Sequence, residues 1–327
     1  MKQQSVKPKS VKPKSETGST SELNGPTSLV NQLIVLGAGY LGQKVALQAV
    51  ERGFQRVVGI RRQQLSLAHV DTLALDLLES EGQSSLKALC KSLVTSRSSD
   101  SGKLQRVGIF YCLSPDSGDE DAYRSVYQKG LSTLLRILDE SGAPEEFHVV
   151  LASSTSVYQD HDGSWVDEST TDERPPTHGT GRMIYEGERL LRHSTVQSTI
   201  LRFGGIYGPE RRYFVERVRH RQEPLFDGQP LFSNRIHVHD AATMVHFCLQ
   251  NRSCHGQTFN GVDCDPAARN DVIQYLWSQF GDSRIPLEHT SNLSAIRHRG
   301  NKRVKSEKIR SLGFSFKFPS YKEGYGF

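Results

Sequence analysis

Three glycines in the stretch "LGAGYLG" have the spacing of a phosphate-binding turn. Gly37, Gly39 and Gly42 form the pattern G-x-G-x-x-G, which follows an apolar, strand-like run and opens a helix-like run. In that context the first glycine permits a tight turn, the second lets the backbone approach a pyrophosphate, and the third packs the helix closely against the strand. We therefore predict a dinucleotide cofactor, with Tyr40 and Leu41 of the same loop among its contacts. The alternative is a glycine-rich turn that holds no ligand.

Two arginines stand where the ribose of such a cofactor is expected. The second strand-like run ends in "GIRRQQ", which places Arg61 and Arg62 about 20 residues after the glycines, where an NAD(H) site has a carboxylate for the ribose 2′-hydroxyl. Guanidinium groups can instead bind a 2′-phosphate through charge-assisted hydrogen bonds. The pair predicts NADP(H) rather than NAD(H). The alternative is that both arginines are simply solvated at the end of a strand.

The elements that must position these residues alternate between strands and helices. This alternation predicts βαβ units and an α/β fold with a doubly wound, Rossmann-type parallel sheet covered on both faces. We expect the cofactor domain over 29–203 and a smaller C-terminal substrate lobe over 204–327, with some segments returning to the sheet. The predicted strands are 32–37, 56–60, 70–76, 106–113 and 147–153, and the predicted helices are 40–53, 83–92, 120–141, 211–221, 241–250 and 271–281. The run "RIHVHD" is predicted to end a strand, with Asp240 as the N-cap of the helix that follows.

The excess of basic residues is concentrated at the start of the chain. The 327 residues carry a net charge of +5, and residues 1–15 contain five lysines and no acid, so 36 basic residues face 36 acidic ones in the remainder. We expect residues 1–28, rich in Lys, Pro and Ser, to form a disordered tail. Because the rest of the chain is neutral, we expect no nucleic-acid partner. The alternative is a tail that tethers the protein to nucleic acid or to an acidic protein.

Other patterns narrow the class of protein further. We find no run long and apolar enough for a membrane helix and no apolar core of a secretory signal, so we expect a cytoplasmic protein without a membrane partner. No cluster of His, Cys and acidic residues has ligand spacing, so we expect no metal. The basic run from Arg297 to Arg310 is expected to lie on the surface.

Several motifs in order resemble the extended short-chain dehydrogenase/reductase superfamily, of the NAD-dependent epimerase/dehydratase type. They are "LIVLGAGYLG", "IFYCLSP", "VVLASSTSVY", "LRFGGIYGPE" and "NRIHVHDAA", and the C-terminal stretch resembles that of a nucleoside-sugar epimerase-like branch. The resemblance covers nearly everything from about residue 30 onward. It implies that Asp76 and Leu77 lie near the adenine of the cofactor.

The same resemblance implies where catalysis takes place, and there the chain departs from the family pattern. Ser154 matches the Ser or Thr that polarises a substrate oxygen. The family pairs a proton-transferring Tyr with a Lys four residues later, and aligning on Glu188 puts Thr180 and Ile184 in those two places. Isoleucine has no charge, and a threonine hydroxyl is too weak an acid for proton transfer at neutral pH.

Other side chains remain as candidates for the proton source. Tyr158 and Tyr207, which the family keeps near the cofactor pocket, are predicted acids together with water. Tyr185 lies about 100° around the helix from Ile184, which favours packing over catalysis. Glu168 is a conceivable general base, although an acid that stabilises its loop is the stronger interpretation.

A second departure concerns the substrate diphosphate. The family often clamps this group with an Arg at the place that Ser233 occupies here. Strand alternation predicts that Arg235 points in a different direction unless the loop is shortened.

Together these observations predict an NADP(H)-dependent oxidoreductase or epimerase. Its substrate would be a small, polar or anionic carbonyl or hydroxyl compound, for example a sugar nucleotide. The alternative is a catalytically silent protein that binds NADP(H) and reports its state to a partner. A homodimer is expected by analogy with the family alone.

Overall fold

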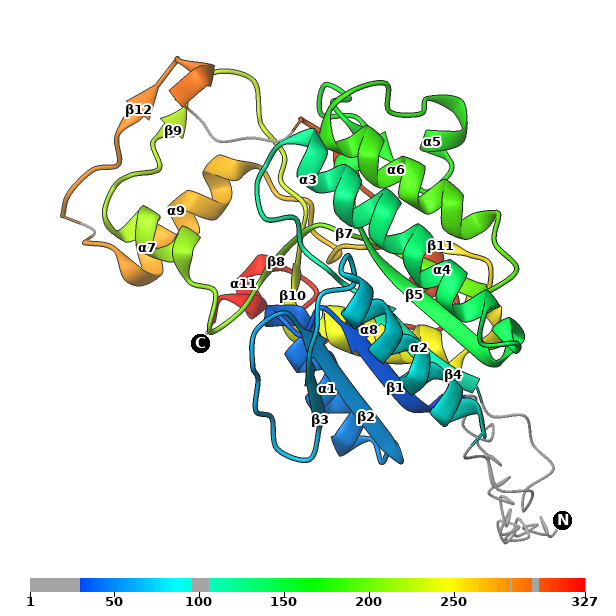
Figure 1. Cartoon of the computed structure of the whole chain (residues 1–327). Coiled ribbons are helices and arrows are strands. Elements are labelled where there is room, and N and C mark those ends of the chain that lie inside the picture. The colour runs from blue at the N-terminus through cyan, green and yellow to red at the C-terminus, as the bar shows by residue number, and fades with distance from the viewer. Residues whose placement is uncertain (1–29, 96–105, 283, 296–299, 327) are drawn as a thin grey trace, which may run out of the picture.

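The computed structural model describes residues 30–95, 106–282, 284–295 and 300–326 (Figure 1). The tail predicted over residues 1–28 lies outside these ranges. Within them, no helix combines the length and the apolar character needed to span a membrane.

A seven-stranded sheet of parallel strands forms the centre of the described structure. Its strands run in the order β11-β7-β5-β4-β1-β2-β3, which is the doubly wound arrangement that the sequence predicted. The central strands are apolar on both faces because helices cover both sides of the sheet. The strands are β1 (Val30–Leu36), β2 (Arg56–Arg61), β3 (Asp71–Ala74), β4 (Arg106–Tyr111), β5 (Phe147–Ser154), β7 (Gln197–Phe203) and β11 (Thr258–Gly261).

Each face of the sheet has its own set of helices and its own apolar core. One core joins the sheet to α2, α4 and α6, and the other joins it to α1 and α8, which also pack against each other. The helices of these layers are α1 (Tyr40–Glu51), α2 (Ser80–Thr95), α3 (Glu120–Arg124), α4 (Leu131–Asp139), α6 (Gly179–Arg192) and α8 (Val238–Gln250). A π-helical segment, Ser125–Gly130, joins α3 to α4, so the helix predicted over 120–141 is continuous but not uniformly α-helical.

A smaller lobe, formed mainly by the C-terminal third of the chain, extends to one side of the sheet (Figure 1). Its core lies between α7 and α9 and includes aromatic side chains from α11 and its C-terminal flank. The helices outside the sheet layers are α5 (Thr170–Glu173), α7 (Tyr213–Arg219), α9 (Arg269–Phe280), α10 (Glu307–Ser311) and α11 (Tyr321–Gly324). Short parallel strand pairs join distant segments: β6 (Trp165–Val166) with β13 (Arg303–Val304), β8 (Gly205–Tyr207) with β10 (Arg235–His237), and β9 (Leu225–Phe226) with β12 (His289–Thr290).

The start of α8 corrects a prediction. "RIHVHD" does not continue as a strand, because the helix begins at Val238 and the ring of His237 caps it by accepting a hydrogen bond from the backbone N–H of His239. Asp240 is therefore not the N-cap. Its buried carboxylate accepts hydrogen bonds from the backbone N–H groups of Lys317 and Phe318, which ties the C-terminal segment to the helix.

A buried ion pair connects α6 to the sheet. The guanidinium of Arg202 on β7 donates to both carboxylate oxygens of Glu188 on α6, at 2.9 and 2.7 Å, and both side chains are fully buried. The carboxylate of Glu188 also accepts hydrogen bonds from Ser153 at 2.6 Å and from Arg192 at 2.9 Å. Because a buried charge is tolerated only when it is paired and hydrogen-bonded, this network fixes α6 relative to the carboxyl ends of β5 and β7.

We predict that Arg202→Met lowers the free energy of unfolding by about 3–5 kcal/mol, because the carboxylate of Glu188 loses its fully buried partner. Chemical denaturation measures this loss. The matched control is Arg192→Met, which removes the more exposed partner of the same carboxylate and should cost about 1 kcal/mol. Equal losses in the two variants would contradict the central role of Arg202.

Candidate functional site

The glycine loop has the geometry of a pyrophosphate cradle. Gly37 has a φ of +102°, and a Cβ on it would collide with the carbonyl group of Cys112. A Cβ on Gly42 would collide with the carbonyl oxygen of Gly37, so helix α1 can approach the turn only with glycine there. A Cβ on Gly39, in contrast, would meet nothing closer than 4.0 Å. Gly39 therefore leaves open space in front of the N-terminus of α1, as a bound pyrophosphate requires.

One cavity extends from the glycine loop along the carboxyl ends of β2 and β3. It has a volume of about 540 Å³, and its lining includes Gly37, Gly39, Arg61, Arg62, Asp76 and Leu77. The structure thus brings together the loop, the arginine pair and the predicted adenine contacts. Their common position follows from the parallel sheet, whose strands β1, β2 and β3 all end at this edge.

The two arginines of this cavity have different partners. Arg61 donates a hydrogen bond to the side chain of Gln63 at 3.0 Å. Arg62 forms a two-pronged ion pair with Asp116, a residue that follows β4. The hydrogen bonds from Arg62 lower the pKa of Asp116 below its usual value.

A second cavity, of about 410 Å³, continues from the glycine loop toward β5. It shares Gly37 and Gly39 with the first, and Tyr40, Leu41, Gly42, Ser154 and Ile184 also line it. Tyr40 lies beneath the guanidinium of Arg211, whose central carbon is 5.1 Å from the ring centre. Burial raises the pKa of Tyr40 to about 12, so this phenol keeps its proton at neutral pH.

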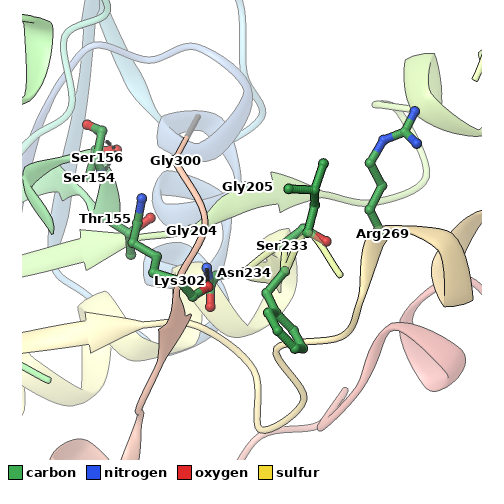
Figure 2. A pocket seen from close by; sticks show the side chains of 12 residues that line it. Ser154, Thr155, Ser156, Gly204, Gly205, Ser233, Asn234, Arg269, Gly300 and Lys302 are labelled. Atoms are coloured by element: carbon green, nitrogen blue, oxygen red, sulfur yellow. Dashed lines mark hydrogen bonds between the residues drawn. The ribbon is translucent and has the colours of Figure 1, made fainter. Parts of the chain in front are cut away.

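Ser154 lies where this second cavity meets a third. It is the last residue of β5, and its hydroxyl accepts hydrogen bonds from the backbone N–H of Ser156 at 3.2 Å and the hydroxyl of Ser156 at 3.0 Å. The third cavity, of about 380 Å³, is shown in Figure 2. Its lining residues are Ser154, Thr155, Ser156, Gly204, Gly205, Leu231, Phe232, Ser233, Asn234, Arg269, Gly300 and Lys302. The three cavities form one continuous cleft with Ser154 near its middle.

The hydroxyl groups of the two predicted tyrosine acids are engaged away from this cleft. Tyr158 is buried, donates to the side chain of Asn260 at 2.6 Å and accepts from Arg202 at 2.9 Å. Tyr207 packs against Tyr325 and His237. Burial raises the pKa of both phenols above the usual value, and neither lines any of the three cavities. Tyr158 is packed in the core of the sheet domain, and Tyr207 is packed in the core of the smaller lobe.

Helix α6 presents no proton-transfer pair to the cleft. Ile184 lines the cavity beside the glycine loop, and its neighbour Tyr185 turns away and donates to the backbone carbonyl of Thr171 at 3.4 Å. Thr180 lies at the edge, in a shallow hollow with Ser156 and His178. Glu168 accepts a hydrogen bond from the backbone N–H of Asn260 at 2.7 Å, which is the geometry of a residue that stabilises its loop.

The structure places two side chains differently from the sequence prediction. Lys302 was expected on the surface within a basic run, but its side chain is 3% exposed and lines the third cavity. Arg235 was expected to point in a different direction from the family's arginine unless the loop is shortened, and its guanidinium donates to the hydroxyl of Ser233 at 2.7 Å. The burial of Lys302 could have been predicted in part from the sequence. In "NKRV", the alternation of a short strand puts Lys302 on the same side as buried Val304.

Comparisons with known proteins agree with this geometry. At the level of sequence, neither the models of protein families nor the characterised proteins match the chain. Solved structures do match. A protein of Methylobacillus flagellatus, provisionally assigned as an NAD-dependent epimerase/dehydratase, is 27% identical with a TM-score of 0.70 over 91% of this chain and 97% of its own. In fold and motifs, the chain is similar to NAD-dependent epimerase/dehydratases, which is consistent with the extended short-chain dehydrogenase/reductase superfamily.

Two further solved structures show the same fold at lower identity. MoeE5 in complex with UDP-glucuronic acid and NAD is 20% identical, with a TM-score of 0.69 over 90% of this chain and 96% of its own. The UDP-glucose 4-epimerase of Thermotoga maritima, solved with UDP-glucose, is 17% identical with a TM-score of 0.67 over the same shares.

We predict that Gly39→Val weakens the binding of NADH and NADPH at least about 10-fold, equivalent to about 1.4 kcal/mol, while the melting temperature stays at the wild-type value. The added side chain would occupy the open space in front of α1, where its Cβ meets nothing closer than 4.0 Å. Calorimetric titration and thermal unfolding measure the two effects. Gly42→Val is the contrasting variant. It should lower both the nucleotide affinity and the melting temperature, because its side chain collides with the loop. Unchanged affinity in Gly39→Val would show that no pyrophosphate approaches this turn.

Proposed function

We propose that this protein binds NADP(H) and acts as an oxidoreductase or epimerase on a polar carbonyl or hydroxyl substrate of the sugar-nucleotide class. The observation that carries the proposal is the continuous cleft. Its cavities run from the arginine pair past the glycine loop to Ser154, and from Ser154 into the polar cavity under the smaller lobe. A bound dinucleotide would supply hydride exchange, and the residues of the chain would hold and orient both molecules.

The preference for NADP(H) is supported by charge at the end of β2. Arg61 ends the strand and its neighbour is Arg62, so two guanidinium groups line the cavity where NAD(H)-specific sites place an acid. Asp116 neutralises part of this charge through its ion pair with Arg62. A 2′-phosphate would compete with that carboxylate for Arg62. It would meet less competition at Arg61, whose hydrogen bond goes to the neutral amide of Gln63.

An anionic substrate is supported by Arg235. Its side chain is 7% exposed, and among the described residues one of its terminal nitrogens, Nη1, has no hydrogen-bond partner although it is buried. The other, Nη2, contacts Ser233, which lines the third cavity. A buried, incompletely satisfied guanidinium next to a polar cavity suits a phosphate group. MoeE5, which has the same fold, binds the anionic sugar nucleotide UDP-glucuronic acid.

We expect wild-type protein to bind NADPH more tightly than NADH, and Arg61→Asp to weaken NADPH binding about 10-fold or more because a carboxylate would face the 2′-phosphate. Calorimetric titration with both nucleotides measures this. Asp116→Asn is the matched variant, since it removes the exposed carboxylate that pairs with Arg62 and should strengthen NADPH binding alone. Equal affinities for the two nucleotides in all three proteins would remove the basis for NADP(H) preference.

Ser154→Ala should reduce turnover about 100-fold or more, because the substrate oxygen loses a hydrogen-bond donor at the reacting position, whereas dinucleotide affinity should stay nearly unchanged. Steady-state kinetics on a panel of sugar nucleotides and small carbonyl compounds, with calorimetry on the same samples, separates the two effects. Ser278→Ala, a change on the exposed face of α9, is the control. Normal turnover in Ser154→Ala would disprove the role given to this hydroxyl.

A second function is favoured by the apolar wall at Ile184. If the cleft binds the dinucleotide but no proton source serves it, the protein would act as a sensor that reports NADP(H) to a partner. Cofactor-dependent capture of a partner, combined with no cofactor oxidation or reduction on the whole panel, would support this function over the enzymatic one.

A further inference from the structure

We propose that Lys302 is the proton-transfer residue of this protein and that it serves a substrate oxygen held at Ser154. The proposal rests on the proposed function, namely that the cleft holds a dinucleotide and a carbonyl or hydroxyl substrate. In this arrangement the proton source is a lysine just before strand β13, and not a tyrosine or lysine on α6.

Chemistry within the third cavity favours Lys302 over its neighbours. Among the residues that line it, only Arg269 and Lys302 carry an ionisable side chain. Arg269 donates to the carboxylate of Glu223 and, at 2.7 Å, to the backbone carbonyl of Pro224, and Figure 2 shows its guanidinium turned away from Ser154. A guanidinium also does not release its proton at neutral pH, whereas an amine can.

Three ionisable groups of the adjoining cavity hold their protons too tightly to be good proton donors. Among its described lining residues, Tyr127 donates to the backbone carbonyl of Ala152 at 3.3 Å, and the thiol of Cys112 donates to the backbone carbonyl of Gly37 at 3.1 Å. Burial raises the pKa of both groups, and of Tyr40 as well, so all three keep their protons near neutral pH.

The backbone around Lys302 is held by two asparagine side chains. Asn234 donates to the carbonyl of Lys302 at 3.0 Å and accepts from the N–H of Val304 at 2.8 Å. Asn301 accepts from the N–H of Phe232 at 2.8 Å and donates to the carbonyl of Pro230 at 3.0 Å. These contacts fix the segment against the edge of the cavity, and Asn234 is therefore a positioning residue for Lys302.

The side chain of Lys302 ends beside the turn that carries Ser154. Its ammonium donates to the backbone carbonyl of Gln159 at 2.8 Å, and Gln159 follows the 3₁₀ turn Thr155–Tyr158 that begins directly after Ser154. Figure 2 shows the Lys302 side chain extending toward this turn from the segment on the other side of the cavity. Lys302 and Ser154 thus line the same cavity from two separate parts of the chain.

The surroundings of Lys302 make its proton mobile. Burial lowers its pKa to about 8, and the carboxylate of Asp160 acts in the opposite direction. The charge of Lys302 in turn contributes to the lowered pKa of the nearby imidazole of His161. At neutral pH most of the amine is protonated and a useful fraction is neutral, so the group can donate a proton and accept one.

The proton step balances in both directions. When a carbonyl substrate is reduced, an N–H bond at Nζ of Lys302 breaks and an O–H bond forms at the substrate oxygen, while the carbonyl carbon gains the hydride that a reduced nicotinamide supplies. Water then reprotonates the neutral amine. When an alcohol is oxidised, its O–H bond breaks and the neutral amine of Lys302 accepts the proton, while the hydride from the carbinol carbon would pass to an oxidised nicotinamide.

The test compares Lys302→Met, Lys302→Arg and the control Lys305→Met, whose residue lies in the same segment but not in the cleft lining. We expect Lys302→Met to lower kcat about 100-fold or more with little change in NADPH affinity. Lys302→Arg should not restore turnover, because it keeps the charge but not the labile proton. Lys305→Met should behave as wild type. The panel contains sugar nucleotides and activated dicarbonyl compounds, and thermal unfolding verifies that each variant is folded.

A second readout needs no turnover. Trace acetylation with acetic anhydride across a pH series, followed by peptide mass spectrometry, reports the titration of each lysine. Lys302 should titrate near pH 8, well below the surface lysines at about 10.4. In active protein, the pH dependence of kcat should show a limb at the same pH that disappears in the residual activity of Lys302→Met.

Each outcome decides the proposal. A Lys302 midpoint like that of the surface lysines, or turnover in Lys302→Met within about 3-fold of wild type, would overturn it. Absence of turnover on the whole panel in a protein that binds NADPH would also overturn it, in favour of the sensor. If wild-type protein binds neither nucleotide, the proposed function itself fails. This failure is told apart from a failure of the Lys302 proposal because nucleotide binding by wild-type protein is measured before any Lys302 variant is compared.

Discussion

The buried pair between Arg202 and Glu188 is the interaction on which the arrangement of the cleft depends. Its two charges lie in a region closed to water, where the loss of hydration is offset only if nearly every donor and acceptor is used. The network meets that requirement by engaging Ser153, the residue before Ser154, and Tyr158, four residues after it. The pair therefore determines where β5 ends, how α6 crosses the sheet, and which side chains remain free to face a ligand.

This constraint also explains the distribution of polar groups along the cleft. Tyr158 and Glu168 hydrogen-bond to the side chain and the backbone of Asn260 on β11, and neither of them lines the three cavities. Helix α6 contributes the apolar side chain of Ile184 to the wall of the cleft. In the third cavity, polar side chains come from the turn after β5 and from three segments in the last third of the chain, which contribute Ser233 and Asn234, Arg269, and Lys302. The lining of the third cavity thus depends on how the C-terminal segment packs against the sheet.

Several positions in the predicted site follow from local sequence pattern, while the roles of these residues stay predictions. The strand–glycine–helix unit, the arginines at the end of β2 and the pair Asp76–Leu77 all lie at one edge of the parallel sheet, because successive parallel strands place their carboxyl ends together. Asp240 shows the limit of the same reasoning. Its spacing suits an N-cap, yet the helix begins two residues earlier, and the carboxylate holds a segment almost eighty residues away.

The sequence by itself determined the α/β class, the cofactor-type loop, the position of Ser154 and the departure from the Tyr–Lys pattern at Thr180 and Ile184. These features depend on short stretches of sequence, where periodicity and residue spacing are enough to predict them. Only the tertiary structure decided which distant groups share the cleft: it buried Tyr158 and Tyr207 in packed clusters and brought Lys302 to the turn after Ser154. The physical reason is that burial and pairing depend on contacts between segments far apart in the chain, and a pattern of neighbouring residues does not contain them.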